Sequence, residues 1–262
     1  MKKTIIVFLL VSYGFLSAFF YSPSPTHREP KKFTVVIDAG HGGKDPGAVA
    51  AGIKEKDIAL SIALKLGKMI QDSIQDVKVL YTRTQDVFVE LHERSNMANL
   101  AKADLFISIH CNANDKAQAE GTETFVMGLH KNDGNLEVAK RENAAILLEE
   151  DYENNENYGG FDPNSPIGHI IFSMFQNAFL SKSLEIASHV EDEFKIRTGL
   201  KSRGVKQAGF LVLWRTSMPS ILVETGFITN PTDRALMASE EGQGKITLSI
   251  FNAFKKYYSQ KG

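Results

Sequence analysis

From Phe33 onward, short runs of β-branched and aromatic residues alternate with longer stretches that carry a helical stripe of apolar positions. Five runs have the composition of strands: Phe33–Asp38, Lys78–Thr82, Asp104–His110, Thr122–Met127 and Ser220–Glu224. Four stretches have helical periodicity: Asp57–Ile74, Leu91–Ala103, Ile170–Ile196 and Lys245–Tyr258. This alternation predicts one α/β domain over residues 33–262, with a twisted, mainly parallel or mixed sheet flanked by helices on both faces.

One region departs from this alternation. A short helical pattern, Leu136–Glu150, runs into the acidic sequence EEDYENNENYGG and a turn with proline, so that Glu137–Pro166 forms an insertion. Five acidic residues between Glu149 and Glu156 are typical of a solvated surface excursion. The same segment could also form a lid over a functional site, and the pattern alone leaves both readings open.

The N-terminus has the pattern of an export signal. Lys2 and Lys3 precede the apolar run Ile5–Tyr21, and a polar, proline-containing segment follows. We therefore expect residues 1–22 to be a signal peptide or an uncleaved anchor, and residues 23–32 to be a linker. Contact with a membrane is expected only through an uncleaved N-terminal segment.

Composition narrows the function further. The formal net charge of −1 gives no basic surface for a nucleic-acid partner. The single cysteine, Cys111, excludes an intramolecular disulfide. Because neighbouring side chains on a strand point to opposite faces, Cys111 is expected to face the core if His110 faces a site.

Four residues that can bind a metal or transfer a proton stand at or beside the ends of predicted elements. His41 lies just after the first strand, in a loop with three glycines that allow close backbone approach. His110 and Glu224 end two other strands, and Glu55 comes directly before a helix. Since sites in open α/β sheets form outside the carboxyl ends of strands, these four side chains are predicted to converge.

The residue types suggest the chemistry. Two imidazoles and one carboxylate are a known ligand set for catalytic zinc, which keeps its fourth position for water. We therefore expect Zn²⁺ bound by His41, Glu55 and His110, with Glu224 as the carboxylate that moves protons. Each residue alone also has a structural reading, such as a helix-dipole partner for Glu55. Their joint occurrence favours an exported zinc hydrolase.

Four sequence blocks in order resemble the zinc-dependent N-acetylmuramoyl-L-alanine amidases of the type-3 amidase family, the amidases of the cell wall and of cell division. The blocks are IDAGHGGKDPGA, IKEKDIAL, YTRTQDVFVELHERSNMANLAKADLFISIHCNA and RGVKQAGFLVLWRTSMPSILVETGFITNPTDRALM. The resemblance implies that His41, Glu55 and His110 bind zinc and that Glu224 is the catalytic acid and base. It also implies hydrolysis of the amide between the lactyl group of N-acetylmuramic acid and the L-alanine of the peptidoglycan stem peptide, in wall remodelling and daughter-cell separation.

The resemblance further implies a role for the insertion, because division amidases of this family carry a regulatory helix there. We expect the insertion to occlude the zinc, with Glu142, Glu149 or Glu150 in the open position, until a protein activator displaces it. A zinc peptidase acting on stem peptides and a non-catalytic peptidoglycan-binding protein remain as alternatives. The expected location is outside the cytoplasm, in a periplasm.

Overall fold

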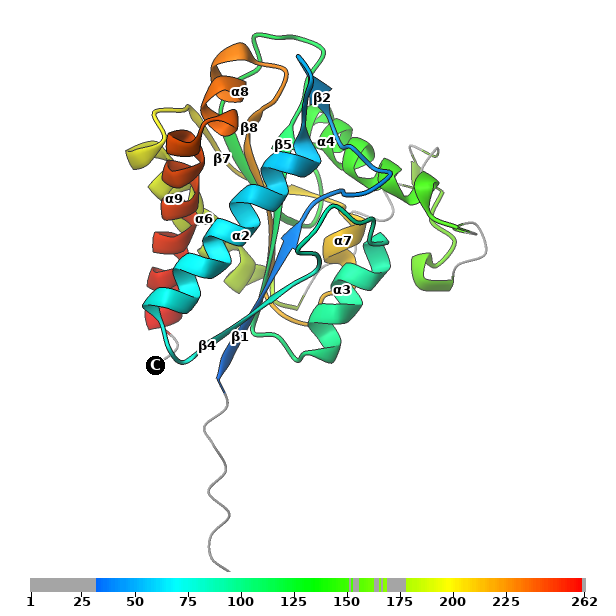
Figure 1. Cartoon of the computed structure of the whole chain (residues 1–262). Coiled ribbons are helices and arrows are strands. Elements are labelled where there is room, and N and C mark those ends of the chain that lie inside the picture. The colour runs from blue at the N-terminus through cyan, green and yellow to red at the C-terminus, as the bar shows by residue number, and fades with distance from the viewer. Residues whose placement is uncertain are drawn as a thin grey trace, which may run out of the picture. The chain divides into compact units, whose positions relative to one another are not determined.

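The computed structural model describes residues 32–150, 152, 156–162, 165, 167–168 and 178–260 (Figure 1). Residues 32–262 form one compact unit by their internal contacts. The expected leader, residues 1–22, and nearly all of the expected linker lie outside the described residues. Within the described ranges, no helix combines the length and apolar character needed to cross a membrane.

A six-stranded mixed sheet forms the centre of the domain, in the order β4-β1-β5-β8-β6-β7. Its strands are β1 (Phe33–Ala39), β4 (Val77–Tyr81), β5 (Leu105–Asn112), β6 (Thr122–Met127), β7 (Ser202–Ala208) and β8 (Ser220–Phe227). The first four strands in that order are parallel, while β6 pairs antiparallel with β8 and parallel with β7. A separate two-stranded ribbon consists of β2 (Val49–Ala50) and β3 (Ile53–Lys54).

Helices cover both faces of the sheet, as Figure 1 shows. One face packs against α2 (Glu55–Ser73), α6 (Leu180–Arg197) and α9 (Glu240–Ser259), and the other against α3 (Leu91–Leu100), α4 (Asp133–Asn143) and α7 (Leu211–Trp214). The remaining described elements are α8 (Pro231–Ala238) and the 3-10 helices η2 (Ala144–Leu148) and η4 (Glu156–Tyr158). The expectation of a mixed α/β sheet flanked on both faces is confirmed.

The alternation along β5 decides which face carries the site. Ile107, Ile109 and Cys111 pack into the core under α2, α6 and α9, whereas Phe106 packs on the other side. Because side chains alternate along a strand, His110 shares the face of Phe106, which is the face covered by α4. The expectation that Cys111 faces the core is confirmed, since its side chain is fully buried there.

The helix expected over Leu136–Glu150 has different bounds. Its start is fixed by Asn132, whose side chain accepts a hydrogen bond from the backbone N–H of Asn135, so α4 begins at Asp133. It ends at Asn143 and continues as the 3-10 helix η2. The helix expected from Ile170 is described only from Leu180, as α6, because residues 169–177 lie outside the described ranges.

Several short or edge elements were not anticipated from the sequence, namely β2, β3, η4, β7, α7 and α8. The strand β7 lies at the edge of the sheet and is only partly buried, so its sequence SRGVKQA lacks the apolar run of a central strand. The helix α7 has four residues, which is too short for a periodic pattern.

Candidate metal centre

His41 occupies a backbone conformation that is uncommon for a non-glycine residue, with φ at 60°. Its Nδ1 lies 2.7 Å from Oδ2 of Asp45, which orients the ring and directs Nε2 toward the interior. The buried guanidinium of Arg94 donates to the carbonyl oxygen of His41 at 2.9 Å. The loop therefore positions this imidazole from both its side chain and its backbone.

Glu55 is the first residue of α2 and is fully buried. Its Oε2 accepts from the backbone N–H of Ala48, and its Oε1 accepts from the backbone N–H of Cys111, both at 2.8 Å. These two bonds fix the carboxylate between the loop that precedes α2 and the end of β5. Sequence reasoning placed Glu55 just before the helix, and the structure places it in the first turn.

His110 lies near the end of β5, with its ring against the backbone of Gly40. A Cβ atom at Gly40 would lie 2.4 Å from Cε1 of His110, closer than real Cβ contacts come. Gly47, with φ at 63°, makes a similar approach, since a Cβ there would lie 2.7 Å from Oε2 of Glu55. Two glycines of the loop thus leave the space that the site residues occupy.

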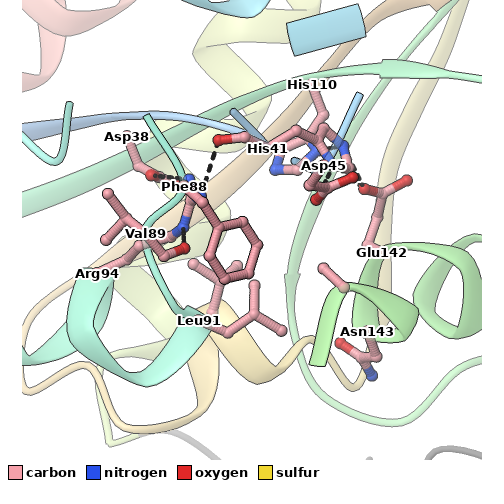
Figure 2. A pocket seen from close by; sticks show the side chains of 12 residues that line it. Asp38, His41, Asp45, Phe88, Val89, Leu91, Arg94, His110, Glu142 and Asn143 are labelled. Carbon is pink, nitrogen blue, oxygen red and sulfur yellow. Dashed lines mark hydrogen bonds and ion pairs between the residues drawn. The ribbon is translucent and has the colours of Figure 1, made fainter. Parts of the chain in front are cut away.

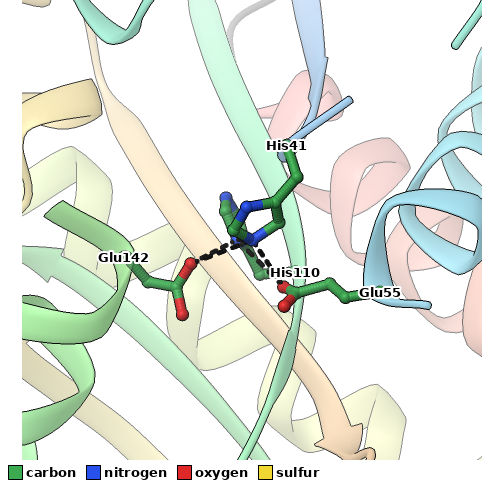
Figure 3. A group of neighbouring side chains, drawn as sticks. All are labelled: His41, Glu55, His110 and Glu142. Carbon is green, nitrogen blue, oxygen red and sulfur yellow. Dashed lines mark hydrogen bonds and ion pairs between the residues drawn. The ribbon is translucent and has the colours of Figure 1, made fainter. Parts of the chain in front are cut away.

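These three side chains converge with a fourth, Glu142 of α4 (Figure 3). The His41 Nε2 atom is 3.0 Å from Oε1 of Glu55, 3.2 Å from Nδ1 of His110 and 3.2 Å from Oε2 of Glu142. The His110 Nδ1 atom is 3.2 Å from Oε1 of Glu55 and 2.9 Å from Oε2 of Glu142. Four buried ligand atoms therefore surround one point.

Their spacing fits a tetrahedral zinc ion. Zinc bonds to nitrogen and carboxylate oxygen are about 2.0–2.2 Å long, which puts neighbouring ligand atoms about 3.3–3.6 Å apart in a tetrahedron. The five contacts given above run from 2.9 to 3.2 Å, slightly shorter than those edges. Two imidazoles and two carboxylates are also a donor set that suits zinc. The residues present fit the metal.

Glu142 is the acidic residue of the insertion that reaches the cluster. Glu149 follows η2, and its side chain instead contacts the first residue of α3: its Oε1 accepts from the backbone N–H of Leu91 at 2.7 Å. Glu150 is exposed. We call residues 133–148, which comprise α4 and η2, the cover segment, because they place Glu142 over the three floor residues His41, Glu55 and His110.

Glu224 lies on β8 directly opposite His110 in the parallel pairing of β5 with β8, so both side chains share one face. It is completely buried, and neither carboxylate oxygen has a hydrogen-bond partner among the described residues. The nearest cation is Arg141, whose Nη2 lies 3.8 Å from Oε1 of Glu224. A buried carboxyl without a partner is costly unless it serves a function.

The electrostatics follow from this crowding. Burial lowers the pKa of His110, but the carboxylates of Glu142 and Glu55 outweigh it and raise the pKa to about 9. Burial raises the pKa of Glu55, but the charge of His41 and the hydrogen bonds with His110 and His41 together outweigh it and bring the pKa to about 2. Burial and the nearby Glu142 raise the pKa of Glu224 well above its ordinary value. The cluster is thus charged, and the separate carboxyl of Glu224 favours its neutral form.

Several supporting residues were missed in the sequence. Asp38 accepts from Arg94 at 2.8 Å and from Thr82 at 2.6 Å, below the loop that carries His41 (Figure 2). Arg83 donates to the carbonyl oxygens of Ala39 and Gly40. A signal for Asp45 existed, since it follows His41 by four residues in the same loop. The arginines lie in other segments and gave no such signal.

The space between floor and cover is small. A cavity of about 10 Å³, roughly the volume of one water molecule, lies among residues of the loop, of α3 and of the cover segment. Its lining includes Asp38, His41, Phe88 and Glu142 (Figure 2). This cavity is too small for a substrate.

A central mixed sheet with a buried cluster of two histidines and two glutamates, beside a buried glutamate that has no hydrogen bond within the described part of the chain, has the features of a metal-dependent hydrolase. A family model described as N-acetylmuramoyl-L-alanine amidase matches residues 35–256. The chain therefore belongs to the N-acetylmuramoyl-L-alanine amidase family, and the resemblance found in the four sequence blocks is confirmed.

Individual relatives agree with this assignment. The amidase AmiA of Salmonella typhimurium is 33% identical over 241 residues, which cover 91% of this chain and 80% of AmiA. The crystal structure of an N-acetylmuramoyl-L-alanine amidase from Clostridium difficile aligns with a TM-score of 0.66 and 27% identity, covering 89% of this chain and all of that one. The CwlD amidase of Clostridioides difficile, solved in complex with the GerS lipoprotein, aligns with a TM-score of 0.63 and 26% identity, covering 87% of this chain and 98% of that one.

Proposed function

We propose that this protein hydrolyses the amide between the lactyl group of N-acetylmuramic acid and the L-alanine of the peptidoglycan stem peptide, with one zinc ion bound by His41, Glu55 and His110. The observation that carries the proposal is the convergence of these ligand atoms at tetrahedral spacing beside the unpaired carboxyl of Glu224. Membership of the amidase family supports the choice of substrate.

The chain's own residues divide the work. Zinc held by these residues would act as a Lewis acid and would lower the pKa of a bound water to about 7. Asp45 holds His41 in the tautomer that presents Nε2, and the backbone N–H of Cys111 holds Glu55. Glu224 accepts a proton from the attacking water and delivers it to the alanine nitrogen as the carbon–nitrogen bond breaks. Its position opposite His110 on the neighbouring strand supports this role.

We further propose that the cover segment keeps the enzyme inactive until a partner displaces it. Glu142 takes the fourth ligand position, and the cavity of about 10 Å³ beneath it leaves no room for substrate. A related amidase has been solved in complex with a lipoprotein, which supports a protein partner as the activator. The remainder of the expected lid, up to Pro166, lies partly outside the described residues.

The proposed location is outside the cytoplasm, in a periplasm, where peptidoglycan is accessible. The apolar run Ile5–Tyr21 after two lysines supports export. In that location, hydrolysis of stem peptides would serve wall remodelling and daughter-cell separation.

The test is mass spectrometry of purified peptidoglycan after digestion with zinc-loaded protein carrying Glu142→Ala, compared with the same protein carrying Glu224→Ala as well. We expect stem peptides with a free L-alanine amino terminus from the first protein and none from the second. We also expect Glu142→Ala to release them at least about tenfold faster than the unsubstituted chain, which corresponds to about 1.4 kcal/mol.

Other products would support other functions. Shortened stems that remain attached to sugar would indicate a zinc peptidase. Binding to peptidoglycan without any released product would indicate a non-catalytic binding protein. Equal rates with and without Glu142→Ala would contradict the proposed role of the cover segment while leaving the amidase reaction intact.

A further inference from the structure

The cover segment brings a second charged side chain, Arg141, into the site. Its Nη1 donates to the carbonyl oxygen of Ala113 at 2.7 Å, and its Nη2 donates to Oδ1 of Asn112 at 3.2 Å. The same Nη2 lies 3.8 Å from Oε1 of Glu224. Three oxygens from the end of β5 and from β8 thus converge on one guanidinium. The same guanidinium also pairs with Oε1 of its neighbour Glu142, from Nη2 at 2.9 Å and from Nε at 3.0 Å.

The acceptor atom of Asn112, Oδ1, is held in place by residues that do not belong to the cover segment. The Asn112 Nδ2 atom donates to Oε2 of Glu123 at 2.8 Å, and Oε1 of Glu123 accepts from Nε of Arg203 at 2.6 Å. A carboxylate only accepts and a guanidinium only donates, so the amide of Asn112 has one orientation that satisfies both neighbours. Asn112 is fully buried. Its Oδ1 therefore faces the position of Arg141 whether or not Arg141 is present.

These oxygens need a donor when the cover segment moves. Arg141 is the side-chain donor to Ala113 and Asn112 in the described part of the chain, and it leaves together with α4. Buried acceptors without a donor are unfavourable, so an incoming ligand that offers N–H groups gains their full hydrogen bonds. Because three oxygens converge here, a group with several N–H donors gains more than a group with one.

We propose that Asn112 Oδ1, the Ala113 carbonyl oxygen and Glu224 form the subsite for the α-amino group of the alanine that hydrolysis releases, and that Arg141 occupies this subsite in the covered state. The inference rests on the proposed amidase function. It goes beyond that function, because it assigns a binding site for the leaving nitrogen and a second inhibitory contact on the cover segment.

The chemistry of the product matches the three oxygens. Hydrolysis adds the water oxygen to the carbonyl carbon, breaks the carbon–nitrogen bond and passes one water proton through Glu224 to the nitrogen. The products are a carboxylic acid and an amine, and the amine takes up the proton of the acid near neutral pH, because an α-amino group has a pKa of about 7.7–8.0. An ammonium group has three donors and no acceptor. Like this ammonium group, the guanidinium of Arg141 is positively charged and carries only donors.

The test measures binding by isothermal titration calorimetry to the full chain carrying Arg141→Ala and Glu142→Ala. The probes are the dipeptide L-alanyl-D-glutamate and its N-acetylated form, which lacks the positive charge of the amine. We expect the free-amine dipeptide to bind at least tenfold more tightly. This preference should persist in metal-free protein, because the subsite oxygens do not depend on zinc.

A matched variant tests the role of Arg141. Lys140 is its neighbour on α4, is equally exposed at 31%, and pairs with Glu137 rather than with the floor. In the Glu142→Ala background, Arg141→Ala should raise the affinity for the free-amine dipeptide at least tenfold, whereas Lys140→Ala should leave it unchanged. Equal effects of the two substitutions would overturn the proposed occupation by Arg141.

Further outcomes separate the subsite from the proposed function. Equal affinities for the two dipeptides, or a preference seen only with zinc bound, would overturn the subsite, since the amine would then bind at the metal. Release of stem peptides by the same protein would leave the amidase function standing in that case. Asn112→Ala should reduce the preference at least fivefold; Arg203→Ala, at a more exposed position, gives the same test with a smaller loss if Asn112→Ala does not fold.

Discussion

The floor of the site and the cover segment are held in place by different parts of the chain: the floor by backbone, the cover by side chains. Each floor residue is fixed by the backbone of the sheet or of its loop, as His110 is by β5 and by the close approach of Gly40. The cover segment is attached through a few side chains, among them the buried Ile146 and Asn143, which binds Gly209 and Leu211. The floor is therefore part of the sheet and its loops, and the cover segment is the part that we propose to leave without unfolding the domain.

The largest effect is expected from Glu224, the residue beside the floor that we propose to transfer the proton. In the Glu142→Ala background, Glu224→Gln should lower the rate of amide hydrolysis about 10²–10⁴-fold, because it removes the group that moves the proton. The bound zinc, measured by mass spectrometry of the metal, should not change. Glu191→Gln replaces another buried glutamate, one bonded to Thr124 and Ser202, and should have little effect on rate. Loss of zinc from Glu224→Gln would contradict the division of roles.

A pair of matched core substitutions compares the contribution of the sheet with that of the cover segment to the stability of the domain. Ile107 on β5 and Ile146 on η2 are both fully buried. Truncating a buried isoleucine to alanine costs about 2–5 kcal/mol. Ile107→Ala should lower the free energy of global unfolding by this amount in urea denaturation. Ile146→Ala should mainly speed hydrogen exchange of residues 133–148. A comparable loss of global stability from both would show that the cover is integral to the domain.

The orientation of His41 gives a smaller effect on the floor. Asp45→Asn removes the carboxylate that binds Nδ1 of His41, and loss of such a partner typically weakens metal binding about 10–100-fold. Competition with a chromophoric chelator measures the zinc affinity. Asp57→Asn, at an exposed position in the first turn of α2, is the control and should leave the affinity within about twofold. Similar losses from both would indicate a general charge effect.

The smallest effect concerns the far end of the insertion and its dependence on pH. Burial raises the pKa of Glu149, partly opposed by hydrogen bonds from Tyr158 and the backbone of Leu91, with Glu90 and His92 nearby. A raised pKa means that Glu149 binds a proton more tightly when the cover segment is docked on the domain than when it is undocked. Docking is thus most favourable below the ordinary value of 4.5 and weakens as pH rises through the raised pKa.

Hydrogen exchange of residues 133–148, corrected for intrinsic rates, measures this dependence. We expect exchange to increase as pH rises, and Glu149→Gln to make it independent of pH over the same interval. The exposed neighbour Glu150 provides the control, since Glu150→Gln should keep the dependence of the unsubstituted chain. Faster exchange at lower pH would contradict the sign of the effect.

Much of the architecture could be predicted from local pattern. The bounds expected for β1, β4, β5 and β6 agree closely with the observed ones, because each of these strands has an apolar or β-branched run that the sequence displays. The edge strand β7 and the four-residue α7 were missed, since neither has a periodic apolar signal. The early start of α4 follows from the Asn132 cap, which outweighs the apolar periodicity used to place the helix.

The sequence by itself determined the alternation of strands and helices and the family to which the chain belongs. It also supplied the candidate site residues His41, Glu55, His110 and Glu224. For the residue that covers the site it left three candidates, Glu142, Glu149 and Glu150, and it offered no signal for Arg141. Only the tertiary structure selected Glu142 and brought Arg141 onto Asn112 and Glu224. The physical reason is that a helix docked against a sheet presents side chains according to its packing angle and register, which depend on contacts far apart in sequence.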